Sequence, residues 1–311
     1  MTTAFITHSD CLKHETPSGH PEQVARLEYI LRAVEDLDLL RIEAPLAEKE
    51  NILAVHPQSH IDLIHANSPE TGMSQLDGDT HMSPGTVTAA YRAAGGAICA
   101  VDTVISGKAN NAFVAVRPPG HHAEAQIPMG FCIFGNVAIA AKHALDFHKL
   151  PKVAVIDFDV HHGNGTQDLL WNEPRALTVT SHQMPLWPGT GRAEEQGEFD
   201  NVLNLPLAPN SDGALMRKVY TERVFPKVRS FNPDLIFLSA GFDAHVDDPL
   251  AELNWEVDDF VWITSEVCNL ARDCCSSRVV SILEGGYNLD CLLYTSPSPR
   301  DRTRSRMPSS A

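Results

Sequence analysis

The sequence predicts an α/β fold built on a largely parallel β-sheet. Five apolar runs are each too short for a helix, and their composition indicates strands that are buried on both faces. Helical patterns separate most of these runs, as expected where helices connect parallel strands. The 311 residues, 43% of them hydrophobic, suffice for one large domain or two small ones, and no repeat or linker divides residues 1–292.

The elements can be placed in order along the chain. Short strands are expected at residues 4–7 and 41–44, with a helix between them at 21–37. An Ala-rich helix is expected to begin at the Ser83-Pro84 pair, a favourable cap and first residue, and to end at Gly107. The five buried strands are expected at 113–116, 153–156, 177–179, 235–238 and 279–283.

Polar residues that are typical of active sites follow each of the five buried strands. The segments are RPPGHH (117–122), DFDVHH (157–162), TSHQ (180–183), SAGFD (239–243) and EGGY (284–287). Ligands of open parallel sheets bind beyond the carboxyl ends of the strands. We therefore expect these segments to form one shared site.

The overall charge and the cysteines restrict the class of protein. A net charge of −16 argues against a nucleic-acid-binding surface and against contact with an anionic membrane. The N-terminus lacks a signal-peptide pattern, and no apolar run approaches the ~18 residues of a membrane span. The seven cysteines are scattered without a CxxC pair. A reducing, cytoplasmic location is therefore the expectation.

Three residues at two strand ends indicate a metal site. Asp159 and His161 are two residues apart, so in an extended segment their side chains point the same way. Asp243 follows another strand and can supply a third ligand. Such a set leaves a fourth position for water, as a catalytic zinc requires. The alternative is that buried Asp and His residues only satisfy each other, but Gly163 and Gly165 mark a tight loop here and favour the metal.

Other residues at the strand ends have more than one interpretation. Asp157 can orient a histidine or bind a structural cation. His121 and His122 are either further ligands or a pair that moves protons near neutral pH. Tyr287 can donate a hydrogen bond to an oxyanion, or it can be a surface aromatic after an ordinary Gly-Gly turn.

Seven segments, taken together and in order, resemble the zinc-dependent histone deacetylase family. They are GHPEQVARL (19–27), RPPGHHAE (117–124), MGFCIFGNVAIAA (129–141), VIDFDVHHGNGTQ (155–167), PGTG (188–191), SAGFDAH (239–245) and LEGGYN (283–288). The likeness covers residues 1–292 and is closer to class II of the family than to class I. The family includes the bacterial acetoin-utilisation and acetylpolyamine deacetylases. It implies the arginase–deacetylase fold, a single three-layer α/β/α domain with a mostly parallel sheet of about eight strands.

The resemblance also assigns catalytic roles, residue by residue. Asp159, His161 and Asp243 match the ligands of one catalytic Zn²⁺. His122 matches the general base, and Asn164 stands where the partner of that base is found. His121 matches a neighbouring histidine that pairs with Asp157, and Tyr287 matches the donor to the oxyanion.

The same resemblance implies a substrate tunnel and two further binding sites. Phe131 and Trp187 match the tunnel walls, completed by Gly130 and Leu250, and Trp187 departs from the Phe of many relatives. Arg26 matches the arginine of an inner acetate cavity. A structural K⁺ is implied at Asp157, Asp159, His161, Thr180 and Ser181.

The implied reaction is hydrolysis of an acyl-lysine peptide or a small N-acyl amine, with release of acetate. Acetylpolyamine-specific relatives carry a Glu after the Asp-Pro step, whereas Leu250 follows Asp248-Pro249 here. Two other functions stay open. An arginase-like dimanganese hydrolase is one, because residues 243–247 read DAHVD. A non-catalytic acyl-lysine-binding protein is the other. Neither a nucleic acid nor a membrane is expected as a partner, and the sequence indicates no oligomeric state.

Residues 293–311 are expected to be a disordered, non-native tail. They contain four Arg, three Pro and five Ser and almost nothing to bury. The segment resembles the out-of-frame translation of a cloning adaptor. On that interpretation the deacetylase-like domain spans residues 1–292 and is truncated at its C-terminal end.

Overall fold

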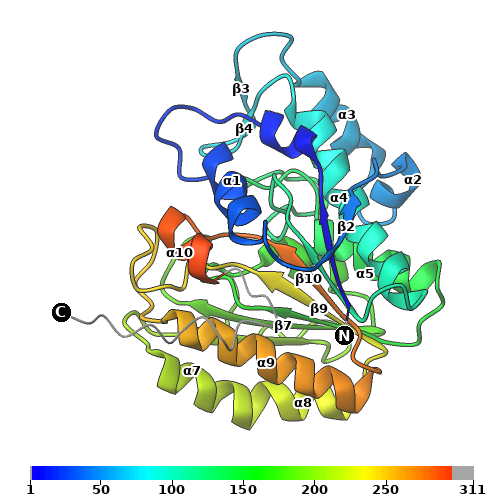
Figure 1. The fold of residues 1–311 in the computed structure, drawn as a ribbon, viewed down its shortest axis with the longest axis vertical. Coiled ribbons are helices and arrows are strands. Elements are labelled where there is room, and N and C mark those ends of the chain that lie inside the picture. The colour runs from blue at the N-terminus through cyan, green and yellow to red at the C-terminus, as the bar shows by residue number, and fades with distance from the viewer. Residues whose placement is uncertain (1, 296–311) are drawn as a thin grey trace.

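A parallel sheet runs through the centre of the molecule (Figure 1). The computed structural model describes residues 2–295. Within them, eight strands lie in the order β2 (Leu40–Glu43), β1 (Thr3–Thr7), β5 (Asn111–Val114), β10 (Val279–Leu283), β9 (Leu235–Ala240), β6 (Val153–Asp157), β7 (Ala176–Gln183) and β8 (Val202–Leu207). Every pair of neighbours in this sheet is parallel. The predicted α/β class and parallel sheet are therefore confirmed.

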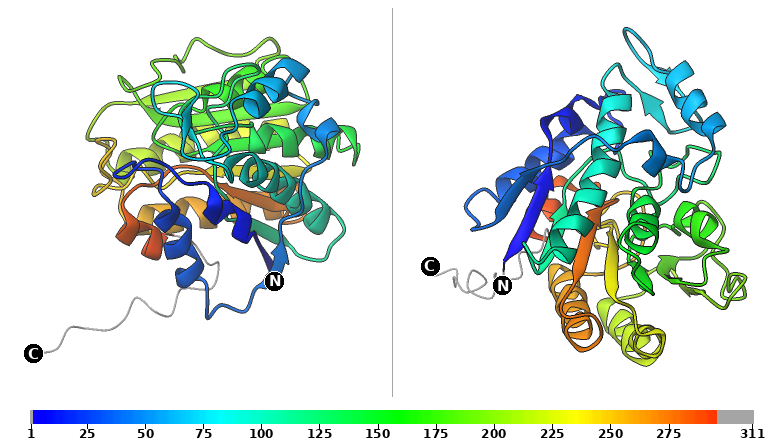
Figure 2. Two further views of the ribbon diagram at one scale, coloured as in Figure 1. Left: turned by 90° about the horizontal axis from the view of Figure 1, so that it is seen from above. Right: turned by 90° about the vertical axis from the view of Figure 1, so that its right-hand side faces the viewer.

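Helices cover both faces of the sheet (Figure 2). One face carries α4 (Thr86–Ile105), α5 (Asn136–Asp146) and α6 (Asn164–Leu170), and the other carries α7 (Gly213–Val219), α8 (Phe225–Phe231) and α9 (Val257–Cys274). The remaining helices are α1 (Val24–Ala33), α2 (Lys49–Ile52), α3 (Gln58–Ala66), α10 (Leu289–Thr295) and the short η1 (Ser9–Lys13) and η2 (Tyr220–Val224). A two-stranded antiparallel ribbon joins β3 (Ser74–Gln75) to β4 (His81–Met82). None of the helices described is long and apolar enough to cross a membrane.

The central strands are buried along their whole length because helices shield both faces. All residues of β6, β7 and β9 are buried, as the apolar runs predicted. Strand β8 was not predicted. It lies at the edge of the sheet and contains Asn204 and an exposed Pro206, so its sequence lacks a continuous apolar run.

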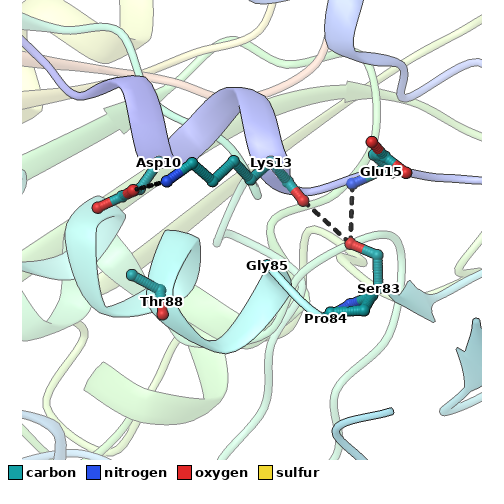
Figure 3. A pocket seen from close by; sticks show the side chains of 7 residues that line it. All are labelled: Asp10, Lys13, Glu15, Ser83, Pro84, Gly85 and Thr88. Atoms are coloured by element: carbon teal, nitrogen blue, oxygen red, sulfur yellow. Dashed lines mark hydrogen bonds and ion pairs between the residues drawn. The ribbon is translucent and has the colours of Figure 1, made fainter. Parts of the chain in front are cut away.

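The predicted start of the Ala-rich helix was wrong. Helix α4 begins at Thr86 with Gly85 as its cap. Ser83 instead accepts a hydrogen bond from the Glu15 N–H (3.0 Å) and donates one to the Lys13 carbonyl (3.1 Å), which ties η1 to α4 (Figure 3). A surface pocket lies at this junction, lined by Asp10, Lys13, Glu15, Ser83, Pro84, Gly85 and Thr88, and none of these residues belongs to the predicted site.

The other helix boundaries shift by a few residues. Helix α1 covers Val24–Ala33 rather than 21–37, and α4 ends before Gly107, which takes a φ of 75°. Helix α10 continues to Thr295, so it passes the domain end expected at residue 292. The rest of the predicted tail, residues 296–311, lies outside the described residues.

Candidate metal centre and active site

The predicted site residues meet at the carboxyl ends of the central strands. Asp157 is the last residue of β6, and the Asp159–His161 loop follows it directly. Asp243 follows β9, and Tyr287 follows β10. Because β6, β9 and β10 are neighbours in the sheet, these loops lie side by side.

Asp159, His161 and Asp243 form a compact and buried cluster. Their possible ligand atoms all lie within 4.8 Å of one another. His161 Nδ1 lies 3.3 Å from Asp159 Oδ1 and 3.1 Å from Asp243 Oδ2. One imidazole nitrogen and two carboxylate oxygens therefore face a common point.

Backbone amides and two glycines fix the carboxylates of this cluster. Asp159 accepts hydrogen bonds from the N–H groups of His161 (2.9 Å) and Gly285 (2.8 Å). Asp243 accepts one from the Val160 N–H (2.9 Å). A Cβ on Gly241 or Gly285 would lie 2.0–2.5 Å from the Asp159 carboxylate, so larger residues would displace it.

The electrostatics of the cluster fit a divalent cation. Burial and the nearby charge of Asp159 raise the pKa of Asp243 to about 7. Burial alone would lower the pKa of His161, but its hydrogen bonds to Asp159 and Asp243 raise it to about 10. In effect a proton on His161 neutralises part of the two buried carboxylates. A cation such as Zn²⁺, which binds this combination of N and O ligands, would replace that proton.

His122 is held as a neutral imidazole with one nitrogen free. Its Nδ1 lies 2.7 Å from Asn164 Oδ1, which can only accept, so Nδ1 carries the proton and Nε2 keeps its lone pair. The Asn164 orientation is fixed in turn, because Nδ2 donates to Glu124 Oε1 (2.7 Å). Burial, together with the charges of His121 and His161, holds the pKa of His122 well below its usual value.

His121 differs from its neighbour in its partners. His121 Nδ1 lies 3.0 Å from Asp157 Oδ2, and the two histidine rings are 3.9 Å apart. Burial alone would lower the pKa of His121, but the charges of Asp159 and Asp157 raise it to about 10. The adjacent pair therefore joins one cationic and one neutral imidazole.

Tyr287 is buried rather than on the surface. Its N–H donates to Asp248 Oδ2 (2.7 Å), and the Arg26 guanidinium lies over its ring, 4.8 Å from the centroid. Burial raises the pKa of the Tyr287 phenol well above 10, so the phenol stays protonated and can donate. The Phe131 ring meets the Tyr287 ring at 80° with centroids 5.7 Å apart.

Trp187, one of the two residues predicted to line a tunnel, stands beside the histidines. The Trp187 ring lies 4.7 Å from the His122 ring and is 42% exposed. Gly130 has a φ of 58°, and a Cβ there would strike the rings of both His122 and Trp187. Leu250 is half-buried, and its N–H donates to Asp248, the residue that also binds Tyr287.

Residues 79–80, just before β4, hold the backbone of the predicted tunnel wall, and the sequence analysis did not single them out. Phe131 takes a φ of 67°, a strained value for an aromatic residue. The Phe131 N–H donates to Thr80 Oγ1 (3.0 Å), and the Gly130 N–H donates to Asp79 Oδ1 (3.2 Å). The His20 ring packs edge-on against Phe131 at 4.8 Å. Residues 79–80 thus clamp the backbone of the wall.

Three buried residues that contact the site, Glu22, Arg117 and Glu284, were not predicted to have a role. Glu22 binds Arg26 (3.0 Å) and, through both carboxylate oxygens, Arg117. Arg26 also donates to the carbonyls of Glu284 and Gly286, each at 2.6 Å. Glu284 accepts from the N–H groups of residues 120 and 121, and burial raises its pKa to about 7. All three residues lie in the motifs that carry the family resemblance, and that position was the only indication in the sequence that they matter.

The residues named for a K⁺ site adjoin the cluster. Thr180 pairs with Asp157 across the β6–β7 ladder, and Ser181 follows it on β7. Ser181 Oγ lies 2.7 Å from the Tyr220 hydroxyl, and Thr180 Oγ1 is buried without a hydrogen-bond partner among the described residues.

Comparison with known proteins agrees with this fold. The family model "Histone deacetylase domain" matches residues 20–297. Histone deacetylase 14, chloroplastic, of Arabidopsis thaliana is 38% identical over 91% of this chain and 72% of its own. The histone deacetylase-like amidohydrolase of Pseudomonas aeruginosa is 37% identical over 87% of this chain and 73% of its own. The crystal structure of the HDA15 HD domain superimposes with a TM-score of 0.88 at 30% identity, covering 94% of this chain and 88% of that one.

These matches identify an α/β protein of a hydrolase family, with the parallel sheet described above. The chain belongs to the histone deacetylase family.

Proposed function

We propose that the protein is a zinc-dependent deacetylase that hydrolyses acyl-lysine or a related N-acyl amine and releases acetate. One observation carries the proposal. A buried, neutral His122 with a free Nε2 lies beside a cluster of three ligands, and the protonated phenol of Tyr287 lies in the same buried site. These groups are the ones that a hydrolase needs to activate water and to stabilise an oxyanion.

The cation would be held by Asp159, His161 and Asp243. When bound, Zn²⁺ polarises the amide carbonyl and lowers the pKa of water to near neutral. His122 Nε2 accepts the proton of the attacking water, while Asn164 keeps the other nitrogen in its protonated form. The Tyr287 hydroxyl donates to the oxyanion. A protonated histidine of the pair then donates to the leaving amine.

The remaining residues position the substrate and balance charge. Phe131 and Trp187 provide an apolar passage for the acyl-lysine stem. Arg26, fully buried behind Tyr287, is proposed to bind the acetate product. A structural K⁺ at Asp157, Asp159, His161, Thr180 and Ser181 is part of the same proposal, and it would offset the negative charge of the two aspartates.

The geometry gives less support to an arginase-like dimanganese site. Among the described residues, His245 and Asp247 form a separate cluster with Cys291 and not with Asp159. His245 Nδ1 already accepts from the Asp247 N–H (3.1 Å) and lies 3.0 Å from Cys291 Sγ. A second catalytic ion would have to break these contacts.

The substrate is tested with acetyl-lysine peptides and acetylspermidine, with zinc restored. The unmodified protein is expected to prefer acetyl-lysine. Leu250→Glu should shift the ratio of kcat/KM values toward acetylspermidine, because it places an acidic group where Leu250 stands. Leu46→Glu, a change at an exposed leucine outside the proposed site, serves as the control for added negative charge. A preference of the unmodified protein for acetylspermidine would contradict this assignment.

A further inference from the structure

A second group of metal-ligating side chains lies where α4 meets the end of α5. Asp102 is in the last turn of α4, His143 in the last turn of α5, and His148 in the segment that leads to β6. His143 Nε2 lies 2.8 Å and His148 Nε2 2.6 Å from the same oxygen, Asp102 Oδ1. Their possible ligand atoms all lie within 4.8 Å of one another.

We propose that Asp102, His143 and His148 form a site for a divalent cation of the Zn²⁺ type, separate from the catalytic centre. Two imidazole nitrogens and one carboxylate oxygen are ligands that Zn²⁺ accepts, and water completes the coordination from the solvent side. The cation replaces the protons through which the two imidazoles now bind the carboxylate.

The local structure holds both imidazoles in position. The N–H groups of Phe147 and His148 donate to the His143 carbonyl, at 2.9 and 3.3 Å. The Phe147 ring stacks on His143 with centroids 4.8 Å apart, and it meets the His148 ring edge-on at 5.0 Å. Phe147 is 69% exposed, and it packs on both imidazoles. The ligands are therefore oriented before any ion binds.

Charge and access also suit a cation. Side-chain exposure is 9% for His143, 20% for His148 and 50% for Asp102, so the carboxylate can be reached from solvent. Burial opposes ionisation of Asp102, but hydrogen bonds from the two histidines lower its pKa. The nearby Lys142 is already paired with Asp146 (2.9 Å) and Glu173 (2.8 Å). Asp102 thus stays negatively charged at neutral pH.

The proposed site is remote from the candidate active site. Helix α5 begins at Asn136, whose side chain donates to the Pro118 carbonyl near the His121 loop. Its 11 residues then run back to the amino ends of the strands, a distance of roughly 16 Å. A cation at the far end would join α4 to the α5–β6 connection (Figure 1) and stabilise the fold without taking part in the reaction.

The test measures zinc binding in a protein whose catalytic cluster is disabled. Chelator-treated Asp243→Ala and the double variant Asp243→Ala/His148→Gln are dialysed against zinc, and bound metal is measured by elemental analysis. The double variant should bind one equivalent less. Zinc should also raise the Tm of Asp243→Ala more than that of the double variant. Adding His65→Gln instead, a change at an exposed histidine of α3, should leave both results unchanged.

A second measurement separates this proposal from the proposed function. His148→Gln alone should keep full deacetylase activity, because the site lies at the opposite end of the strands. Equal zinc content in Asp243→Ala and Asp243→Ala/His148→Gln would overturn the proposal, whatever the result for activity. Loss of activity in His148→Gln at normal zinc content in the catalytic cluster would also contradict it.

Discussion

Tyr287 and His122 depend on burial for the protonation states that the proposed reaction needs. Burial keeps the phenol protonated and the imidazole neutral, so one can donate and the other can accept near pH 7. Asn164 then decides which imidazole nitrogen is free. The chemistry of the site therefore rests on residues that surround the reacting groups as much as on the groups themselves.

Replacing Tyr287 by Phe removes the hydroxyl and keeps the ring that packs against Phe131 and Arg26. If the phenol donates to the oxyanion, kcat should fall by roughly 10²–10³, or about 3–4 kcal/mol of barrier. Metal content should be unchanged and KM only mildly affected. Steady-state kinetics with elemental analysis checks this, with the partly exposed Tyr29→Phe as the control. Near-normal turnover would mean that the phenol takes no part in the reaction.

Single residues were predictable where chemistry and spacing coincide. The two-residue spacing of Asp159 and His161 predicted that their side chains lie close together, and their possible ligand atoms do so, within 4.8 Å. Glu284 was not predicted, because its partners are backbone N–H groups some 164 positions earlier in the chain, at residue 120. A glutamate next to a Gly-Gly pair carries no local sign of such a contact.

The clamp formed by residues 79–80 could not be predicted from the sequence. A short antiparallel ribbon with only two-residue strands gives little periodicity to detect. Yet the loop that leads into β4 holds the backbone of the proposed tunnel wall through Thr80 Oγ1 and Asp79 Oδ1. Strand β8 was missed for a related reason, since an edge strand tolerates Asn204 and Pro206.

Replacing Thr80 by Val removes the acceptor of the Phe131 N–H with little change of shape. Because Phe131 has a strained φ of 67°, the wall should relax. We expect KM for an acetyl-lysine peptide to rise several-fold, because one lost hydrogen bond costs about 1 kcal/mol. The change in kcat should be smaller. Thr88→Val, an exposed threonine on α4, is the matched control. An unchanged KM in Thr80→Val would show that the clamp does not position the wall.

His56, just before α3, should make the stability of the protein depend on pH. His56 accepts from the Gly135 N–H at Nε2 (2.9 Å) and faces the Ala125 carbonyl with Nδ1 (3.1 Å), so it must be neutral. Burial, with the charge of His60, lowers the pKa of His56 to about 3. Below about pH 6.5 the unfolded chain gains a proton at His56 that the folded chain does not bind. Stability is then lost as the pH falls toward 3, by up to about 1.4 kcal/mol per pH unit.

Urea unfolding at pH 7 and pH 5 measures this effect. His56→Gln should show a smaller loss of stability between the two pH values than the unmodified protein, because a neutral side chain replaces the titrating one. His65→Gln, on the exposed side of α3, should lose as much stability between pH 7 and pH 5 as the unmodified protein does. If His56→Gln loses as much stability as the unmodified protein, another group governs the acid response.

Glu22 joins segments that are far apart in the sequence. It binds Arg26 of α1 and Arg117 after β5, and Arg26 extends the contact to the segment after β10. All three side chains are fully buried. The fold class was predictable from the order of apolar runs, whereas this network depends on contacts across nearly the full chain.

Glu22→Gln should destabilise the protein strongly, because two buried guanidinium groups lose the charge that balances them. The expected loss is about 3–5 kcal/mol in the free energy of unfolding. Chemical denaturation of Glu22→Gln and of Glu28→Gln, at an exposed position of the same region, provides the comparison. A loss in Glu22→Gln no larger than in Glu28→Gln would show that the network contributes little to stability.

Deacetylation should depend on one cation, held by Asp159, His161 and Asp243, and this dependence can be tested. Titrating zinc into chelator-treated His148→Gln, while acetate release from an acetyl-lysine peptide is followed, tests it most directly. Because this variant lacks a ligand of the proposed second site, zinc bound there does not add to the measured equivalents. Activity should rise linearly and reach its maximum at one equivalent of zinc, and Asp243→Ala in the same titration should stay inactive. Activity that appears only with two equivalents of manganese, or a fully active Asp243→Ala variant, would contradict the account.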